Sequence, residues 1–518
     1  MLYNPGRRSS PNTKNFVMTQ PATDAALPVQ PDASPTLRDV LRSPSLLTRE
    51  CLAGAITALA LIPEVISFSV ISGIDAKSAL FASAVLCLVM SFLGGRPAMV
   101  TAAAGSVALV VGPMVRVHGA EYILPAVLLA GTIQIAFGLA GFARLMRYVP
   151  RSVMIGFVNA LGILIFLAQI PHIVDKPAVV YLLFAAAVAI VLFFPRLTTA
   201  IPSPLIAVVA ATAVVIAGGL DVPTVGSGGA MPPGLPGLTP WLVPFNLDTL
   251  RIVWPTALSI AFVGLLESLL TAKLVDDMTD TKSSKGRESW ALGVANLCSA
   301  YAGGIAGCAM IGQTVVNVQL GRARTRVSTI AAALILLLLM TSLSGLMAQI
   351  PMVVLAAIMM IVALKAVNWH SLRPATLRRM PLSETVVMVV TVAVTVGTEN
   401  LALGVAVGVL CAMMLFARRV AHVVRADRIL DEDGRSVRYE VHGPLFFGSS
   451  NDLVERFAYA ADPVSVQVDF SASQIWDAST VAALDAIEAK YRDHGKTVSF
   501  VGLDARSRAF HERLTGRL

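Results

Sequence analysis

The sequence predicts a polytopic all-α membrane protein with a small α/β domain at its C-terminal end. The chain of 518 residues is 56% hydrophobic and only 14% charged, and its mean hydropathy is +0.73. Soluble domains carry about 25% charged residues. Long apolar runs recur from Glu50 to about Val424, and a soluble composition begins beyond Ala426. This balance excludes a disordered chain, a collagen and a disulfide scaffold.

The net charge of +8 does not require a nucleic-acid partner. Basic loops on the cytoplasmic side of a membrane explain it, and the partner that this composition predicts is the lipid bilayer. The five cysteines show no CxxC spacing and are interpreted as small core residues. No metal or cofactor site is predicted from cysteine or histidine.

Residues 1–49 are polar and rich in Pro, Ser and Thr, so we expect a disordered cytosolic N-terminus without a signal peptide. Apolar stretches suited to crossing a bilayer, which takes about 20 residues, then follow one another. We place fourteen of them at 50–72, 78–93, 98–115, 121–143, 150–170, 178–195, 202–219, 254–275, 288–303, 310–320, 327–349, 351–366, 382–397 and 400–420.

Basic residues alternate between successive loops, as the positive-inside rule requires. The loops expected outside hold little beyond Arg116, Lys176 and Arg251. The loops expected inside hold Arg96, Arg144, Arg147, Arg151, Arg196, Lys282, Lys285, Arg287, Arg322, Arg324, Arg326, Arg373, Arg378, Arg379, Arg418 and Arg419. An even number of crossings is therefore predicted, with both termini in the cytoplasm.

A stretch rich in Gly and Pro, 218–244, divides the transmembrane domain (50–424) into repeats at 50–219 and 254–420. Seven spans per half is an odd number, so the second half inserts inverted relative to the first. Such 7+7 inverted repeats are common among secondary transporters. Both halves hold an acid within an apolar span, Glu64 and Glu267, followed two spans later by a short segment of small residues.

Glu64 follows Pro63 in the middle of an apolar span, where a charge costs about 2.5–3.5 kcal/mol. We interpret it as a proton-coupling carboxylate; the alternative is a neutral acid hydrogen-bonded between helices. Glu267 and Thr271 lie one helical turn apart. A carboxylate beside a hydroxyl suits a sodium ion, or a proton on Glu267 alone. The alternative is a structural hydrogen bond between helices.

The short segments 98–115 and 305–320 are predicted to be half-helices whose first N–H groups point at a small anion. Thr101, Ser106, Gln313 and Thr314 supply further hydrogen-bonding groups. Neither the small-residue turn around Ala102–Ser106 nor that around Gly307–Gly312 contains a basic residue, which predicts weak recognition of several anions. Close helix packing through small residues is the alternative.

The region beyond Ala426 reads as a cytosolic α/β domain over 436–518. Strands are predicted at 437–447, 464–470 and 497–503. A helix is expected from Ser479 to a stop at Gly495, and another at 505–515.

Three motifs resemble the sulfate permease (SulP) family of anion transporters. They are LIPEVISFSVISGIDAKSALFAS (61–83), GGIAGCAMIGQTVVNVQLGRART (303–325) and VTVGTENLALGVAVGV (394–409). The resemblance implies fourteen spans divided into core and gate domains, an elevator-like motion and a homodimer. It also implies a substrate site between the third and tenth spans and a C-terminal STAS domain open to a cytosolic regulator.

The resemblance also implies roles for individual residues. Glu267 and Thr271 fall where sodium-coupled cyanobacterial bicarbonate transporters have an Asp and a Thr that bind sodium. Ala104 and Gly105 fall at the bicarbonate-contacting turn of those proteins, and Met310–Gln313 at the facing turn. Three of these positions depart from the family pattern: Ala104 and Ile311 each replace a Thr, and Gln313 stands where animal relatives carry an Arg.

The resemblance leaves the coupling ion open, because Glu64 matches an acid linked to proton coupling in other bacterial members. The facing turn of the substrate site consists of Met310, Ile311, Gly312 and Gln313. In the STAS-like part, Ser479 follows Asp477 where regulatory homologues carry a phosphorylatable Ser. The alternative role for Ser479 is to cap the helix that it leads.

The sequence thus predicts a secondary active transporter in the inner membrane that moves sulfate or bicarbonate with protons or sodium. A C4-dicarboxylate symporter and an anion exchanger are alternatives. An anion channel or a STAS-regulated sensor is the alternative from another class. No cofactor is expected beyond the coupling ion, and no nucleophile–base set or metal motif indicates an enzyme.

Overall fold

The computed structural model describes residues 37–141, 143–144, 148–197, 202–228, 236–421 and 424–516. Of the predicted disordered N-terminus (1–49), residues 1–36 lie outside the described residues. Residues 37–49 are largely helical, because α1 spans Leu37–Arg42 and α2 spans Pro44–Ser72. The prediction of disorder is therefore wrong for 37–49, where the helix that enters the membrane part begins earlier than its apolar stretch.

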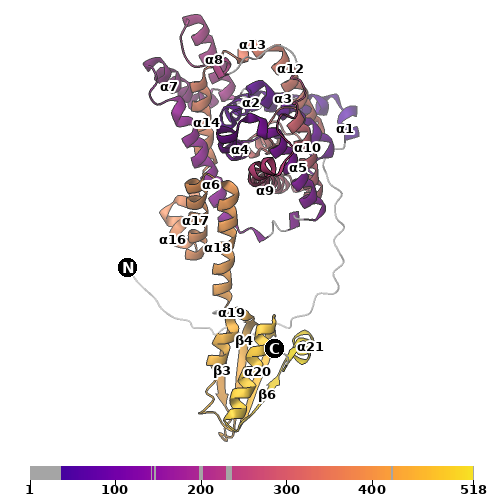
Figure 1. The fold of residues 1–518 in the computed structure, drawn as a ribbon, viewed down its shortest axis with the longest axis vertical. Coiled ribbons are helices and arrows are strands. Elements are labelled where there is room, and N and C mark those ends of the chain that lie inside the picture. Colours follow the sequence, from indigo (N-terminus) through magenta and orange to yellow (C-terminus); the bar gives the residue numbers. More distant parts are fainter. Residues whose placement is uncertain are drawn as a thin grey trace, which may run out of the picture.

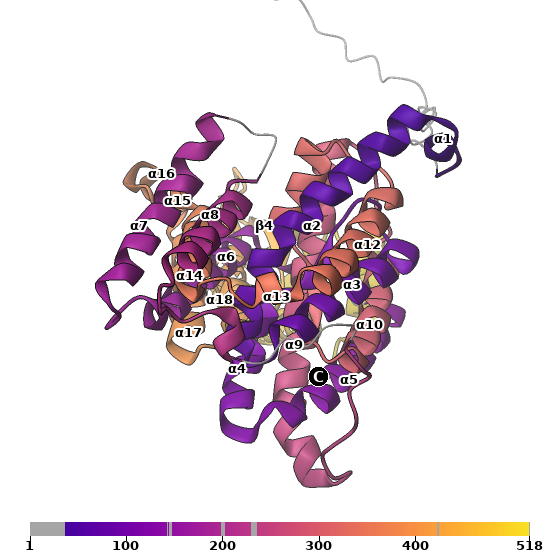
Figure 2. The ribbon, with the colours of Figure 1, turned by 90° about the horizontal axis from the view of Figure 1, so that it is seen from above.

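The molecule is long, with a helical membrane part at one end and an α/β domain at the other (Figure 1). In the membrane part the long helices form two groups, which Figure 2 shows side by side. With α2, the first group contains α3 (Ala76–Leu93), α4 (Gly105–His118), α5 (Ile123–Leu139), α9 (Leu247–Thr279), α10 (Lys285–Tyr301) and α12 (Arg326–Ser342). The second contains α6 (Arg151–Gln169), α7 (Ala178–Phe193), α8 (Ser203–Gly218), α14 (Met352–Ala366), α17 (Leu382–Thr398) and α18 (Leu401–Ala421).

Short elements connect these helices. The α-helical ones are α11 (Ile311–Val315), α13 (Ser344–Met347), α15 (Trp369–Leu372) and α16 (Pro374–Arg379). The 3-10 turns are η1 (Ala120–Tyr122), η3 (Ile170–His172), η4 (Phe194–Arg196) and η5 (Val225–Gly228), and η6 (Val316–Leu320) is a π-helix.

Seven of the described helical segments are long and apolar enough to cross a bilayer, and five shorter apolar helices accompany them. Their burial inside the protein differs widely. The most apolar stretch of α9 is 72% buried, whereas those of α7 and α18 are 22% and 28% buried. Exposed apolar helix faces of this extent suit contact with lipid. The helix α9 therefore runs through the interior of the membrane part, where its side chains meet those of other helices.

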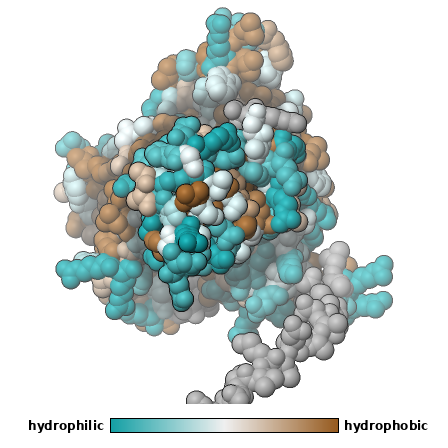
Figure 3. Space-filling view, turned by 90° about the horizontal axis from the view of Figure 1, so that it is seen from below, coloured by the Kyte–Doolittle hydropathy of each residue, from teal (hydrophilic) through white to brown (hydrophobic). Residues whose placement is uncertain are grey.

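The C-terminal domain contains one four-stranded sheet in the order β3-β4-β5-β6. The antiparallel pair β3 (Arg425–Leu430) and β4 (Ser436–Leu445) is extended by the parallel strands β5 (Ser465–Ile475) and β6 (Thr497–Val501). The helices α19 (Phe447–Glu455), α20 (Ala478–Asp493) and α21 (Ala505–Leu514) accompany the sheet. Seen from below, the domain is largely hydrophilic, and apolar residues show on the membrane part behind it (Figure 3).

The structure agrees with the predicted strands β4, β5 and β6 and with the helices α20 and α21 to within a few residues. Strand β3 and helix α19 are not among the predicted elements. Most residues of β3 are exposed, because this strand lies at the edge of the sheet. It therefore lacks the alternation of apolar and polar residues that identifies a half-buried strand.

Asp477, not Ser479, caps α20. One carboxylate oxygen of Asp477 accepts a hydrogen bond from the backbone N–H of Thr480 at 3.1 Å, and the other accepts from that of Phe447 at 2.5 Å. The interpretation of Ser479 as the cap is wrong, because the helix begins at Ala478, which puts Asp477 at the N-cap position and Ser479 inside the first turn. Ser479 lies exposed in the first turn, and its phosphorylation stays a prediction.

Asp462 is the polar centre of the C-terminal domain. Its buried carboxylate accepts hydrogen bonds from the hydroxyls of Tyr439 (2.7 Å) and Tyr491 (2.6 Å) and pairs with the Arg428 guanidinium (2.8 Å). Burial raises the pKa of both tyrosines. The stability that this shift contributes is present below the ordinary pKa of tyrosine, about 10, and is lost as the pH rises. Strands β3 and β4 and helix α20 thus meet at one side chain.

We expect Asp462→Ala to destabilise the C-terminal domain by about 3 kcal/mol, because it leaves two buried hydroxyls and a guanidinium without their acceptor. Hydrogen exchange of the β4 and α20 amides in the full-length protein measures the loss. Asp427→Ala is the matched control, since Asp427 is an exposed acid on β3. Equal protection in both variants would contradict the role of Asp462.

Candidate functional site

Each short small-residue segment is a three-residue strand followed by a helix. Strand β1 (Thr101–Ala103) precedes α4, and strand β2 (Gly307–Ala309) precedes α11. The strands pair antiparallel, with Thr101 opposite Ala309 and Ala103 opposite Gly307. All six strand residues are buried. A Cβ on Gly307 would collide with the backbone of Ala102 and with the side chain of Leu86, so only glycine allows this approach.

Two helices thus begin at this ladder in the interior of the membrane part. Ala104 and Met310 stand at the N-cap positions of α4 and α11, and neither forms a side-chain cap. The first N–H groups of a helix have no partner within it, and they carry the positive end of the helix dipole. Ala104, Gly105 and Met310 are buried, whereas Ile311 is partly buried. The predicted turns therefore present backbone rather than charged side chains.

The second half-helix is attached to the chain that leads into β1. The N–H of Met310 donates to the carbonyl oxygen of Val100 at 2.9 Å, and the N–H of Val100 donates to Thr314 Oγ1 at 3.0 Å. Asn317 Nδ2, in the π-helix η6, donates to the carbonyl oxygen of Ala98 at 2.9 Å. Thr314, predicted as a substrate donor, thus also accepts a hydrogen bond that fixes the position of α11.

Helix α9 brings a carboxylate to the ladder. Glu267 is buried, and one of its oxygens accepts hydrogen bonds from Ser106 Oγ at 2.5 Å and from Cys308 Sγ at 3.1 Å. Ser106 lies in the first turn of α4, and Cys308 lies in β2. The predicted residues Glu267 and Ser106 therefore meet, and three elements from both halves of the chain join at one carboxylate.

Two further residues of α9 fix β2. The Thr271 hydroxyl donates to the carbonyl oxygens of Glu267 (2.8 Å) and Ala309 (3.0 Å), and Ser268 Oγ accepts from the N–H of Ala309 at 2.9 Å. The hydroxyl hydrogen of Thr271 thus points at backbone. Its oxygen lies one turn from Glu267, as predicted.

Glu64 contacts the other half-helix. It lies in α2 and is partly buried, and the side chain of Gln313 is its hydrogen-bond partner. Gln313 Oε1 and Thr101 Oγ1 are buried without a hydrogen-bond partner among the described residues. Gly312, beside Gln313, is exposed, and a Cβ added there would meet no atom within 4 Å. The first turn of α11 therefore faces open space, next to unpartnered polar groups.

Three residues that sequence reasoning missed belong to this centre: Cys308, Asn296 and Gln134. Asn296 of α10 holds both backbone groups of Gly307, accepting from its N–H at 2.7 Å and donating to its carbonyl oxygen at 3.3 Å. It also donates to Gln134 Oε1 of α5 at 2.8 Å. A polar amide within an apolar helix was the available signal for Asn296 and Gln134.

The interpretation of the cysteines as small core residues is confirmed for Cys87, which is buried in the main apolar core. It is wrong for Cys51 and Cys298, which are exposed. Cys308 is buried, but it also donates to Glu267. The sequence around Cys308 contains only small and apolar neighbours, so no local signal marks its polar contact.

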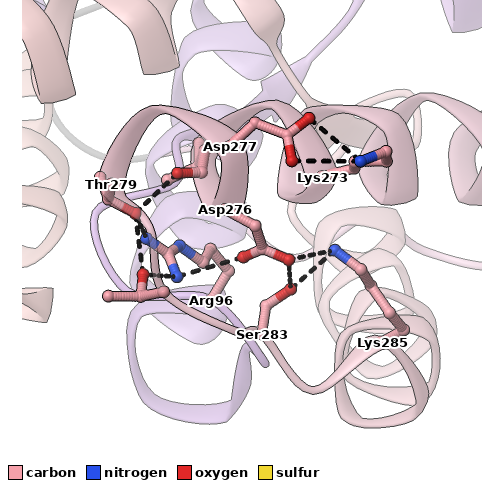
Figure 4. A network of polar contacts seen from close by, with 9 residues as sticks. Arg96, Lys273, Asp276, Asp277, Thr279, Ser283 and Lys285 are labelled. Carbon is pink, nitrogen blue, oxygen red and sulfur yellow. Dashed lines mark hydrogen bonds and ion pairs between the residues drawn. The ribbon is translucent and has the colours of Figure 1, made fainter. Parts of the chain in front are cut away.

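A polar network close to the end of α9 holds the elements that carry the site (Figure 4). Asp276 pairs with Arg96 at 3.2 Å and with Lys285 at 2.7 Å. Arg96 lies in the loop before β1 and also donates to the hydroxyls of Thr279 and Thr281. The half-helix loop, the end of α9 and the start of α10 are thereby joined. These groups are largely buried, so the pairs are less screened by solvent than surface ion pairs.

A model of the sulfate permease family matches residues 47–178 and 175–391. The chain is also 42% identical to "Putative sulfate transporter YbaR" of Bacillus subtilis, over 90% of this chain and 97% of that protein. The chain belongs to the sulfate permease family. The chain is also 26% identical to the bicarbonate transporter BicA of Synechocystis, over 85% of each protein.

Solved structures agree with the fold. Murine Slc26a9, an anion transporter in the inward-facing state, has a TM-score of 0.78 and 18% identity, covering 90% of this chain and 87% of that chain. The transmembrane domain of a cyanobacterial BicA has a TM-score of 0.61 and 24% identity, covering 71% of this chain and 97% of that chain. This sulfate permease member is thus a multi-pass membrane protein of an anion transporter family, and its relatives are not enzymes.

We expect Gly307→Ala to destabilise the membrane part by about 2 kcal/mol, because the added methyl group forces β1 and β2 apart. Thermal denaturation of the purified protein in detergent measures this loss. Gly312→Ala is the control in the same segment, since its methyl group enters open space. The role of the ladder would be refuted if both variants melted at the temperature of the unmodified protein.

Proposed function

We propose that this protein is a secondary active transporter that carries a small inorganic oxyanion, sulfate or bicarbonate, across the inner membrane together with protons or sodium. The observation that carries the proposal is the contact of Glu267 with the first turn of α4 and with strand β2, which leads into α11. A group able to bind a cation thereby lies beside N–H groups able to bind an anion. Binding of one solute then changes the electrostatic energy of the other.

The anion site that we propose lies at the first turn of α11, opposite the start of α4. Gly312 leaves room there, and the N–H groups of two helix starts provide donors. Because the described site residues include no basic side chain, the attraction for an anion comes from the backbone dipoles of the two helix starts. Such a site suits small oxyanions with several acceptor oxygens. The names of the relatives, sulfate and bicarbonate transporters, agree with this class.

The contacts of Glu267 favour a proton over sodium as the coupling ion. Its hydrogen-bonded oxygen has a thiol and a hydroxyl as donors, and sulfur is a poor ligand for a hard cation such as sodium. The Thr271 hydroxyl hydrogen already points at backbone oxygens. A proton binds to the carboxylate with less rearrangement. Sodium coupling is the second candidate, because the Glu267 carboxylate contacts the Ser106 hydroxyl and the Thr271 hydroxyl lies one helical turn from Glu267.

The two groups of helices suggest how the protein moves. We propose that the group containing α2, α4 and α9 is the core domain that carries the site, and that the group containing α6, α17 and α18 is the gate. We also propose that the fourteen predicted stretches cross the membrane as a 7+7 inverted repeat with both termini in the cytoplasm. The protein forms a homodimer, and its C-terminal domain is a STAS domain that binds a cytosolic regulator.

We expect Glu267→Gln to lower the initial rate of anion uptake into proteoliposomes by about tenfold, equivalent to about 1.4 kcal/mol. The amide keeps the shape of the side chain but exchanges no proton and holds no charge. Glu121→Gln, which changes an exposed acid in η1, is the control and should transport normally. Uptake that saturates in the wild type but is equally fast in Glu267→Gln would exclude Glu267 from coupling.

We expect an imposed inward proton gradient to accelerate uptake of labelled sulfate or bicarbonate, with no requirement for sodium. The assay compares both anions, each with and without sodium and each with and without the gradient. Glu267→Gln should lose the response to the gradient. Uptake that needs sodium and ignores the proton gradient would make sodium the coupling ion. Current without any coupling would indicate a channel.

A further inference from the structure

A cavity of about 450 Å³ lies at the end of the membrane part that is nearest to the C-terminal domain (Figure 1). It is formed by the start of α6, the start of α17 and the last turns of α18. None of its lining residues belongs to the ladder, to α9 or to α11. Its polar lining consists of Tyr148, Arg151, Ser152, Ser383, Glu384 and Arg419. The cavity is large enough for a small-molecule head group.

The charges in the cavity favour an anion. Arg151 and Arg419 face one Glu384, and neither arginine forms an ion pair among the residues that the structure describes. Arg419 donates to Ser383 Oγ at 2.7 Å, which holds its guanidinium at the cavity wall. A guanidinium presents paired N–H donors that match the oxygens of a phosphate group. The cavity lining therefore carries one more positive than negative charge, and its two guanidinium groups are suited to binding a phosphate group.

The backbone adds further donors. Pro150 precedes α6 and Pro381 precedes α17, and neither position has a side-chain cap. Ser152 and Ser383 lie in the first turns of these two helices and line the cavity. Two helix starts therefore direct unpaired N–H groups to the same region as the arginines, and this supports anion binding there.

The remaining wall is apolar and continues onto the outside of the protein. Phe416 and Met413 of α18 line the cavity while being 68% and 49% exposed, and Tyr148 at its edge is 53% exposed. Aromatic side chains with a polar tip are typical of the boundary between lipid and water. A soluble phosphate has no apolar part that could contact this wall. A phospholipid combines a charged head group with acyl chains that can.

We propose that this cavity binds the head group of an anionic phospholipid. Arg151 and Arg419 contact its phosphate, the starts of α6 and α17 donate backbone hydrogen bonds, and an acyl chain lies along Phe416 and Met413. The lipid then bridges three helices of the second group at the membrane surface from which α18 continues into the C-terminal domain.

The test compares phosphatidylglycerol with phosphatidylcholine bound to the purified full-length protein, measured by native mass spectrometry during lipid titration. The variant Arg151→Gln with Arg419→Gln is expected to lose preference for phosphatidylglycerol by about fivefold for each arginine removed. The control, Arg378→Gln with Arg379→Gln, removes the same charge from α16, outside the cavity lining. It is expected to stay within about twofold of the unmodified protein, because both side chains are exposed and neither lines the cavity.

Three results would overturn the proposal. One is an absence of preference for phosphatidylglycerol in the unmodified protein, and another is an equal loss in both double variants. The third is displacement of the lipid by millimolar inorganic phosphate, which would make the ligand a soluble anion. The single variants Arg151→Gln and Arg419→Gln change exposed side chains and keep the test usable if the double variant folds poorly. Each is expected to show a partial loss of the preference for phosphatidylglycerol.

Discussion

The antiparallel pairing of β1 with β2 is the constraint on which the rest of the structure depends. A helix that begins inside a bilayer leaves backbone groups without water to bind, and each unsatisfied group costs several kcal/mol. The ladder and its side-chain partners remove much of that cost. Asn296 serves both backbone groups of Gly307, and Ser268 and Thr271 serve those of Ala309. Two helix starts can therefore exist within the membrane.

The interior course of α9 has a chemical consequence for this centre. A carboxylate that is buried needs donors, and Glu267 receives them from Ser106 and Cys308, which belong to opposite halves of the chain. Each half of the membrane part thus supplies one hydrogen-bond donor to Glu267, which itself belongs to the second half. The small residues of the ladder are necessary for this, because larger side chains would separate the two strands that carry or precede these donors.

Much of this fold follows from the sequence, because long apolar runs and intramembrane acids are strong signals in a single chain. The helix breaks at 98–115 and 305–320 were predictable from their small residues. The partners were not: Cys308 contacts Glu267 through a fold that pairs distant segments, and nothing near Cys308 in the sequence indicates it. Likewise, β3 is an exposed edge strand without alternation, and Asp477 caps α20 because the helix starts one residue earlier than its pattern suggested.

The ionic junction at the end of α9 limits how the interior can rearrange. Asp276 and Glu267 lie on the same rigid helix, less than three turns apart. Asp276 forms ion pairs with Arg96, which precedes β1, and with Lys285, which begins α10. Because Arg96 leads into β1 and Lys285 begins α10, a displacement of α9 would move β1 and α10 with it. The surroundings of Glu267 would then keep their shape.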